Sequence, residues 1–195
     1  DFRAIGTAGL VALRTEQVAA LEQEDIVALE TAQLAAMGTE QVRALRSSQI
    51  GWLENNDVAA FRTDQIAVLT TAQVNALELA DVQALKAVQI SALTTQAVAA
   101  IDASYLAKLS TSQIVALRTD QIVAFTTLQA QQLVSSQVRA LTSDQLPALE
   151  TADFAKFAKD RLAEILPDRI TALTTSQLAT LDGTKLNDLI TEQLA

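Results

Sequence analysis

The sequence predicts an all-α solenoid of very short helices, because one octapeptide repeats along the whole chain in a single register. Two observations lead to this fold class. Two series of large apolar residues recur every eight residues, and a Ser or Thr lies between them ahead of residues that favour helix. The 195 residues hold 24 copies of the octad without insertion or deletion. We therefore expect one helix per octad, about five or six residues long.

The two apolar series define the octad. The first series starts at Ile5 and ends at Leu189, and all of its 24 residues are large and apolar. The second starts at Leu10 and ends at Leu194, and Ala130 is its only small member. We number the octad so that the first series is slot 1 and the second is slot 6. Ser or Thr fills slot 3 in 16 copies, Gln fills slot 5 in 14 copies and Asp in 4, and Ala is the commonest residue at slot 8.

The spacing of the apolar residues argues against one continuous helix and against a β-strand. The steps alternate between five and three residues, an average of about four per turn, whereas an α-helix has about 3.6. An apolar stripe with this period would rotate by about 80° per octad, and known supercoils use repeats much nearer to the helical period. In a strand the two series would face opposite sides. The helix is therefore expected to break once in every octad.

Slot 3 is where we expect each helix to begin. Ser or Thr can act as an N-cap by accepting a hydrogen bond from a backbone N–H two or three residues later. Acidic residues are frequent at slot 4, as in Glu16 and Asp64, and complement the positive end of a helix. A helix from slot 4 to the next slot 1 is too short to persist without stacking on its neighbours, as in a solenoid. The predicted N-caps are Thr15, Thr31, Thr39, Thr63, Thr71, Thr111, Thr119 and Thr127.

The glutamine at slot 5 predicts a ladder of side-chain hydrogen bonds. A helix that breaks in every octad leaves backbone N–H and C=O groups without intrahelical partners, and burial requires that they find others. A Gln side chain can both donate and accept, so it can bind the backbone of an adjacent repeat's turn. The alternative is a row of amides displayed to a ligand. The predicted ladder residues are Gln17, Gln33, Gln41, Gln49, Gln65, Gln73, Gln113, Gln121, Gln137 and Gln145.

The repeat becomes less regular toward its end. No linker interrupts the chain, so we expect one domain over residues 1–195, with less regular copies in 151–195. Pro167 stands at slot 3, where a break is expected, whereas Pro147 stands at slot 7 and should distort its copy by removing a hydrogen bond. Residues 151–166 lack an internal cap, which allows one longer helix ending before Pro167. The chain starts without Met, and we expect it to be a fragment of a longer protein.

Composition narrows the functional classes. The chain has no Cys and no His and a formal net charge of -9. It therefore has no disulfide or thiolate metal site, and it lacks the commonest general base. The acidic balance argues against nucleic acid, and no apolar run is long enough to insert into a membrane. No carboxylate has a partner at a motif spacing, so we expect no catalytic, cofactor-binding or metal-binding residues and no cofactor.

The outward slots 2, 4 and 7 hold mostly polar or small residues and should face water. Trp52 replaces Ala at slot 8 after Gly51 and is a candidate partner contact, with local repacking against the glycine as the alternative. Apolar residues at outward slots are the other candidates for a lateral contact, although singly they carry little weight. They are Leu79, Val88, Leu128 and Val134.

Two octads show a resemblance to known arrays. Residues 69–76 read LTTAQVNA and residues 117–124 read LRTDQIVA. They resemble octapeptide arrays of the form LTTxQIxA, which occur in very large bacterial proteins labelled as adhesins or haem-utilisation proteins. The resemblance covers the whole chain and implies a bacterial surface or secreted setting. It carries over no catalytic or binding residues.

The function expected from the sequence is structural. Uniform repetition without a specialised patch favours a spacer or scaffold segment, partnered by the flanking repeats of its parent chain. The alternative is a protein- or peptide-binding repeat module that uses the variable outward slots. The oligomeric state is left open, and an enzyme is not expected.

Overall fold

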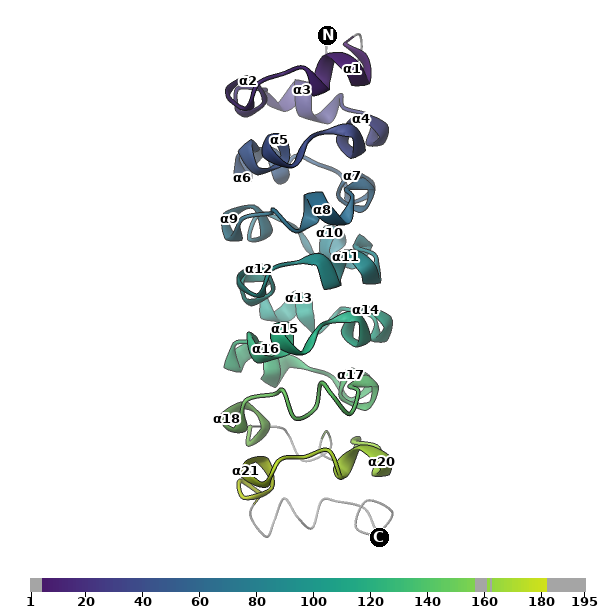
Figure 1. The fold of residues 1–195 in the computed structure, drawn as a ribbon, viewed down its shortest axis with the longest axis vertical. Coiled ribbons are helices and arrows are strands. Elements are labelled where there is room, and N and C mark those ends of the chain that lie inside the picture. Colours follow the sequence, from purple (N-terminus) through teal and green to yellow (C-terminus); the bar gives the residue numbers. More distant parts are fainter. Residues whose placement is uncertain (1–4, 157–160, 162, 182–195) are drawn as a thin grey trace. The chain divides into compact units, whose positions relative to one another are not determined.

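The computed structural model describes residues 5–156, 161 and 163–181, and this part of the chain is all-helical (Figure 1). Residues 1–101 form one compact unit and residues 102–195 form a second. A single domain over residues 1–195 stays a prediction. The helices of the first unit are α1 (Gly6–Val11), α2 (Thr15–Ala19), α3 (Gln23–Val27), α4 (Thr31–Ala36), α5 (Thr39–Ala44), α6 (Ser47–Ile50), α7 (Asn55–Ala60), α8 (Thr63–Ile66), α9 (Thr71–Val74), α10 (Leu79–Ala84), α11 (Ala87–Ala92) and α12 (Thr95–Ala100). Those of the second unit are α13 (Ala103–Leu106), α14 (Thr111–Ala116), α15 (Thr119–Val123), α16 (Thr127–Gln132), α17 (Ser135–Ala140), α18 (Thr151–Phe154), α20 (Pro167–Ile170) and α21 (Thr175–Leu178).

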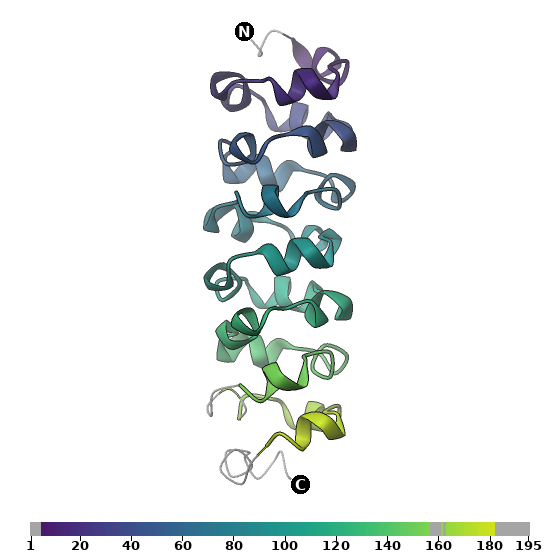
Figure 2. The same cartoon turned by 90° about the vertical axis from the view of Figure 1, so that its left-hand side faces the viewer.

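Within each unit the short helices coil into a solenoid, which confirms the predicted fold class. Helices three octads apart pack together: α1 on α4, α2 on α5 and α7 on α10 in the first unit, and α13 on α16 and α14 on α17 in the second. Side-chain hydrogen bonds reach carbonyls 28–31 residues back along the chain. One turn of the solenoid therefore takes between three and four octads. Figures 1 and 2 show the successive helices and extended links stacked in this way.

The core is a column of slot 1 and slot 6 side chains. Leu34 and Ile66 at slot 6 are fully buried, and Leu45 and Leu69 at slot 1 are each 4% exposed. The two slots lie three residues apart across the helix and both turn inward, so each octad contributes two large apolar side chains. Burying one such side chain contributes about 1.5–3 kcal/mol, which a helix of one or two turns cannot supply alone.

The helices begin one residue earlier than the sequence predicts. From α2 onward, the N-cap of every described helix is the slot 2 residue, with extended backbone such as φ -75° and ψ 160° at Arg14. Slot 3 is already the first helical residue, so its side chain is not in the position that reaches the free N–H groups. The N-cap prediction was therefore wrong for Thr15, Thr31, Thr39, Thr63, Thr71, Thr111, Thr119 and Thr127, which open their helices.

The side-chain caps are slot 2 residues: Asp102, whose carboxylate accepts from the Ser104 N–H at 2.7 Å, and a set of Ser and Thr residues. Their hydroxyl oxygens accept from the slot 5 backbone N–H at 3.1–3.3 Å. These residues are Thr70, Thr94, Ser110, Thr126, Thr142 and Thr174. Elsewhere slot 2 holds residues such as Arg or Glu and has no side-chain cap of this kind, for example at Arg46 and Glu54.

The structure confirms the prediction for Pro147 and contradicts the single helix predicted over residues 151–166. Residues 143–148 form turns rather than an α-helix, which confirms the distortion expected from Pro147. Pro167 is the first residue of α20, a position where a missing N–H costs little. The single helix over residues 151–166 is wrong, because α18 ends at Phe154 and residues 155–156 and 163–164 are turns.

Candidate functional site

Polar side chains at slot 5 are buried repeatedly in both units. Each sits in the first turn of its helix, three residues after the N-cap, and points toward the preceding turn of the solenoid. Gln65 is fully buried, Gln49 and Gln137 are 1% exposed and Gln73 is 2% exposed. A buried amide must be hydrogen-bonded on both its oxygen and its nitrogen to avoid a penalty of about 1–3 kcal/mol.

The amide oxygen serves the helix to which the glutamine belongs. It accepts a hydrogen bond from the slot 2 backbone N–H, with N···O distances of 2.7–3.0 Å. Where slot 2 is Ser or Thr, the two residues cap each other reciprocally, as Thr70 and Gln73 do. The pattern occurs at Gln17, Gln33, Gln41, Gln49, Gln65, Gln73, Gln89, Gln113, Gln121, Gln129, Gln137, Gln145 and Gln177.

The amide nitrogen serves the preceding turn. Gln41 Nε2 donates to the carbonyl of Leu10, at slot 6, over 3.0 Å and to that of Leu13, the next slot 1, over 2.8 Å. These carbonyls lie at the end of a short helix, where no intrahelical N–H is available to them beyond the local turn. We call this pair of contacts a rung. Rungs to both slots are made by Gln41, Gln49, Gln65, Gln73, Gln137, Gln145 and Gln177, and Gln89 binds the carbonyls of Ala59 and Phe61.

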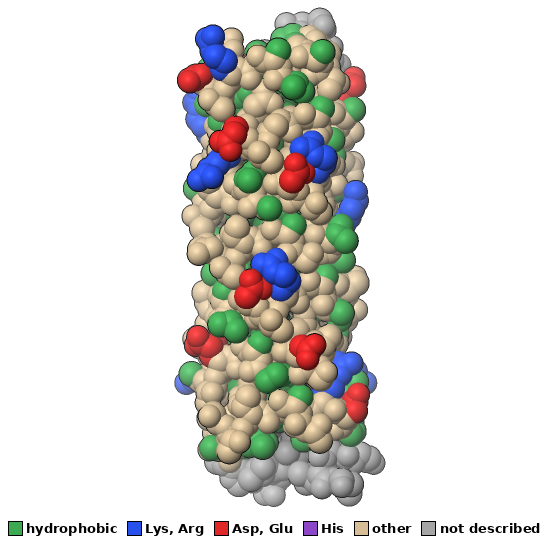
Figure 3. All heavy atoms as spheres, in the orientation of Figure 1, with side chains coloured by type: hydrophobic (Ala, Val, Ile, Leu, Met, Phe, Trp, Pro, Cys, Tyr) green, Lys and Arg blue, Asp and Glu red, His purple; other side chains and the backbone are tan. Residues whose placement is uncertain are grey.

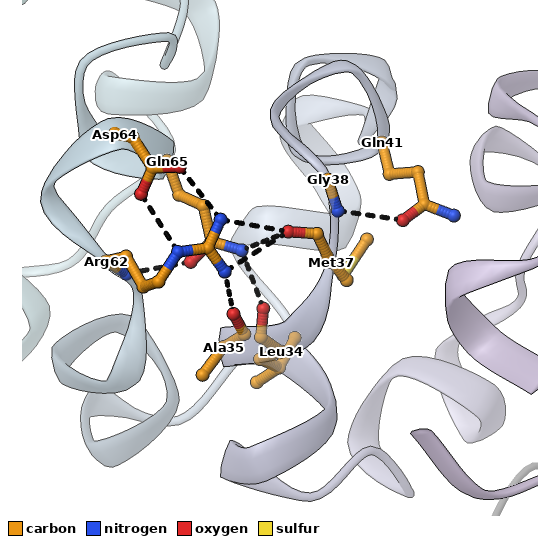
Figure 4. A network of polar contacts seen from close by, with 8 residues as sticks. All are labelled: Leu34, Ala35, Met37, Gly38, Gln41, Arg62, Asp64 and Gln65. Carbon is orange, nitrogen blue, oxygen red and sulfur yellow. Dashed lines mark hydrogen bonds and ion pairs between the residues drawn. The ribbon is translucent and has the colours of Figure 1, made fainter. Parts of the chain in front are cut away.

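An arginine reinforces one rung from outside (Figure 4). Gln65 Nε2 donates to the carbonyls of Leu34 and Met37 at 2.9 and 2.8 Å. The Arg62 guanidinium, three residues earlier, donates to the Met37 carbonyl at 3.4 Å and also to that of Ala35. Asp64 holds the guanidinium through two contacts of 2.8 and 3.0 Å. This hydrogen bond from Arg62 keeps the pKa of the Asp64 carboxyl below its usual value.

Other residue types at slot 5 supply only one of the two functions of the glutamine, either the donor or the acceptor. Arg161 donates to the carbonyl of Gln131, and Arg169 donates to those of Arg139 and Leu141, so arginine supplies the donor half. Aspartate supplies the acceptor half: Asp57 and Asp81 accept from the slot 2 N–H at 3.1 and 2.8 Å. An ionised carboxylate has no N–H to offer the preceding turn.

Burial raises the pKa of both Asp57 and Asp81 above the ordinary value. The Glu54 carboxylate raises the pKa of Asp57 further, and the Glu78 carboxylate raises that of Asp81. The hydrogen bond from the slot 2 backbone N–H lowers both pKa values and partly offsets the shift. Asp81 also feels the charge of Asp57. At Asp57 and Asp81, burial therefore disfavours the charged carboxylate.

The remaining candidates lie on the surface. Trp52 and Leu79 are half-buried, whereas Val88 and Leu128 are 61% and 57% exposed and Val134 is also exposed. On the face shown in Figure 3, charged side chains are scattered, several in pairs of opposite sign, and hydrophobic side chains are dispersed. The described residues contain no group of three or more carboxylates arranged to hold a metal ion.

Two surface hollows accompany these residues, one in each unit. The first, of about 390 Å³, is lined by Gln23, Glu24, Val27 and Ala28. The second, of about 500 Å³, includes the Arg139–Glu164 ion pair and Ser135. In the second hollow the Glu164 carboxylate is paired with the Arg139 guanidinium. Along the described part of the chain, no helix is long and apolar enough to cross a membrane.

The fold and the slot 5 contacts define a repeat module of short helices whose turns are tied by side-chain hydrogen bonds. The model of the ALTTAQ repeat family matches residues 1–29, 18–55 and 53–79. These matches support a repeat family for this part of the chain. No curated protein matches the chain.

Sequence reasoning missed the slot 2 caps and the donor role of Arg161 and Arg169. The signal for the caps was present, because Thr or Ser followed three residues later by Gln is the pattern of a capping box. It was obscured by the commoner Ser or Thr at slot 3. The arginines could not be assigned without knowing that slot 5 faces carbonyl oxygens.

Proposed function

We propose that this chain is a non-catalytic spacer or scaffold segment within a large bacterial surface or secreted protein. The observation that carries the proposal is the uniform use of slot 5. The buried glutamines bind their own helix with the oxygen and, in the rungs, the preceding turn with the nitrogen. Glutamines committed in this way hold their turns in register, and both ends of their amides are already hydrogen-bonded within the chain.

The design suits a stiff, extendable rod segment. Most turns use the same kind of contact with the turn before them, so stability should grow with each added copy as in other one-dimensional arrays. The rungs resist sliding of one turn along the next, because a shift would break donor–acceptor pairs at buried sites. The outward slots are free to vary, as a spacer with no fixed partner allows.

Distance measurements between spin labels test the proposal in the first unit. The chain has no Cys, so Thr31→Cys and Thr71→Cys, both at exposed slot 3 positions, give two unique labels. A spacer should show one narrow distance distribution, and inserting four whole octads between the labels should lengthen it while keeping it narrow. A broad distribution like that of the urea-unfolded chain would contradict the proposal.

A binding module is the second candidate, because several apolar side chains are exposed in the second unit. Val115 and Val123 at slot 7 are 46% and 49% exposed, in addition to Leu128. Peptides selected on the folded chain should lose affinity for Val123→Asp and Leu128→Asp if these side chains form the contact. Selected peptides that bind both variants as well as the wild type would remove this candidate.

A further inference from the structure

Asp153 is the most unusual of the slot 5 residues. It is 2% exposed, and within the described part of the chain its Oδ1 is a buried polar atom with no hydrogen-bond partner. A buried carboxylate oxygen without a partner is strongly disfavoured. Something that the protein side chains do not supply must therefore satisfy it.

The register of the ladder shows what Asp153 faces. One octad earlier, Gln145 Nε2 donates to three backbone carbonyls, those of Ile114, Val115 and Leu117, at 2.9, 3.2 and 2.7 Å. Three octads later, Gln177 makes the same contacts to slots 6 and 1. By the same register, the backbone carbonyls 31, 30 and 28 residues before Asp153 are those of Ile122, Val123 and Phe125.

These carbonyl clusters accept hydrogen bonds from neutral amides and from guanidinium groups alike. The next two octads fill the corresponding position with the guanidinium of Arg161, which donates to Gln131, and of Arg169, which donates to Arg139 and Leu141. In the glutamine copies, the amide nitrogen donates hydrogen bonds to the carbonyls at the equivalent positions. Asp153 instead adds a fourth oxygen acceptor to three carbonyl oxygens.

The length of the Asp153 side chain indicates whether a proton or a larger ion satisfies its buried oxygen. Aspartate is one methylene shorter than glutamine, so its oxygen stops about 1.5 Å short of the position from which Gln145 Nε2 reaches its carbonyls. A proton on the carboxyl cannot bridge a gap of that size. A water molecule has two hydrogens, so it can donate to at most two of these oxygens at once, whereas a cation can contact all of them.

We infer that Asp153, together with the backbone carbonyls of Ile122, Val123 and Phe125, binds a hard metal cation of the size of Na⁺ or Ca²⁺. One carboxylate and several carbonyl oxygens are the ligands such ions prefer, with coordination distances of about 2.3–2.6 Å for Ca²⁺. The absence of nitrogen or sulfur ligands in this set disfavours zinc. The site lies between two turns of the second unit, so the ion takes the place of a rung. This departs from the expectation that no residue binds metal.

Metal-dependent melting of the full chain tests the inference. The protein is stripped with chelator and melted in choline chloride, NaCl or millimolar CaCl₂ at matched ionic strength. Binding to the folded state alone raises the melting midpoint, so Ca²⁺, or Na⁺ if the site is monovalent, should raise it by several degrees over choline. Asp153→Gln should restore the rung, remove this rise and melt higher than the wild type without metal. Asp144→Gln, at an exposed carboxylate in the previous octad, is the matched control and should keep the rise.

Isothermal titration of the folded proteins with Ca²⁺ and with Na⁺ gives a readout that does not depend on unfolding. The wild type and Asp144→Gln should show a binding event that Asp153→Gln lacks. A wild type whose midpoint is the same in all three salts would overturn the inference. So would an unchanged metal response in Asp153→Gln. A midpoint that rises only on acidification, and only in chains with Asp153, would assign the site to a proton instead.

Discussion

Residues 37–76 and residues 141–180 each comprise five octads, but they tie successive turns with different side chains. The first stretch uses Gln41, Gln49, Gln65 and Gln73, each with a complete rung. The second uses two glutamines, at its ends, with Asp153, Arg161 and Arg169 between them. The carbonyls that accept are equivalent in both stretches. Asp57 in the first stretch and Asp153 in the second supply no donor, so a donor at slot 5 is common but not required, and glutamine is the residue that both donates and caps its own helix.

The same comparison shows that a copy of the repeat can keep its buried residues and its rung without forming an α-helix. The octad of Pro147 has no α-helix, because proline lacks the N–H that slot 7 donates to slot 3 in copies such as Ala67 to Thr63. Leu146 and Leu149 are nevertheless 1% and 2% exposed. The rung of Gln145 is also intact. Two buried apolar slots and one rung therefore define a copy, and the helix between them is dispensable.

Deleting half an octad should have the largest effect. Removal of residues 69–72 shifts every later residue by four, which brings polar slots into the core and separates donors from carbonyls. We expect loss of a cooperative thermal transition, measured by circular dichroism. Removal of the whole octad, residues 69–76, is the matched control and should leave a cooperative transition. Equal melting of the two deletions would contradict the octad as the structural unit.

Breaking one rung should come next. Gln65→Met keeps the length of the side chain but removes the donor to Leu34 and Met37 and the acceptor for the Arg62 N–H. We expect a loss of about 1–3 kcal/mol in the free energy of unfolding, measured with urea, because buried backbone groups lose their partners. Gln132→Met, at an exposed slot 8, should change it by less than about 0.5 kcal/mol. Equal effects would mean that the rung contributes nothing.

The sequence was sufficient for the fold but not for the details of the site. Spacings of five and three residues excluded a continuous helix, and this alone led to a solenoid of short helices. It did not show that slot 2 is the N-cap, because Thr70 and Thr71 are both suitable residues and only the backbone angles distinguish them. The partner of a slot 5 side chain lies 28–31 residues away, a distance set by the winding of the solenoid. Nothing local in the octad encodes that winding.

Paired substitutions at neighbouring threonines sharpen the assignment of the cap. Thr70 Oγ1 accepts from the Gln73 N–H at 3.2 Å, whereas Thr71 begins α9 and is exposed. Thr70→Ala should cost about 1 kcal/mol of unfolding free energy, and Thr71→Ala less than about 0.5 kcal/mol. Thr70→Ser should retain most of the stability because it keeps the hydroxyl. A larger loss for Thr71→Ala would return the cap to slot 3.

The smallest expected effect is a change in pH dependence at Asp81, where a carboxylate stands in place of the glutamine donor. Burial and the charges of Glu78 and Asp57 raise the pKa of Asp81 in the folded chain. Between the ordinary carboxyl pKa and this raised value, the folded state holds more protons than the unfolded state, so stability rises as the pH falls through that window. Asp81→Asn removes this contribution. In metal-free buffer, the difference in melting midpoint between wild type and Asp81→Asn should therefore shift in favour of the wild type on acidification.

Asp64→Asn is the control, because the hydrogen bond from Arg62 lowers the pKa of the Asp64 carboxyl and the pH dependence has the opposite sign. The stability from that pair is present above the ordinary carboxyl pKa and is lost as the pH falls through the lowered value. Parallel pH profiles for wild type and Asp81→Asn would contradict a raised pKa of Asp81 in the folded chain.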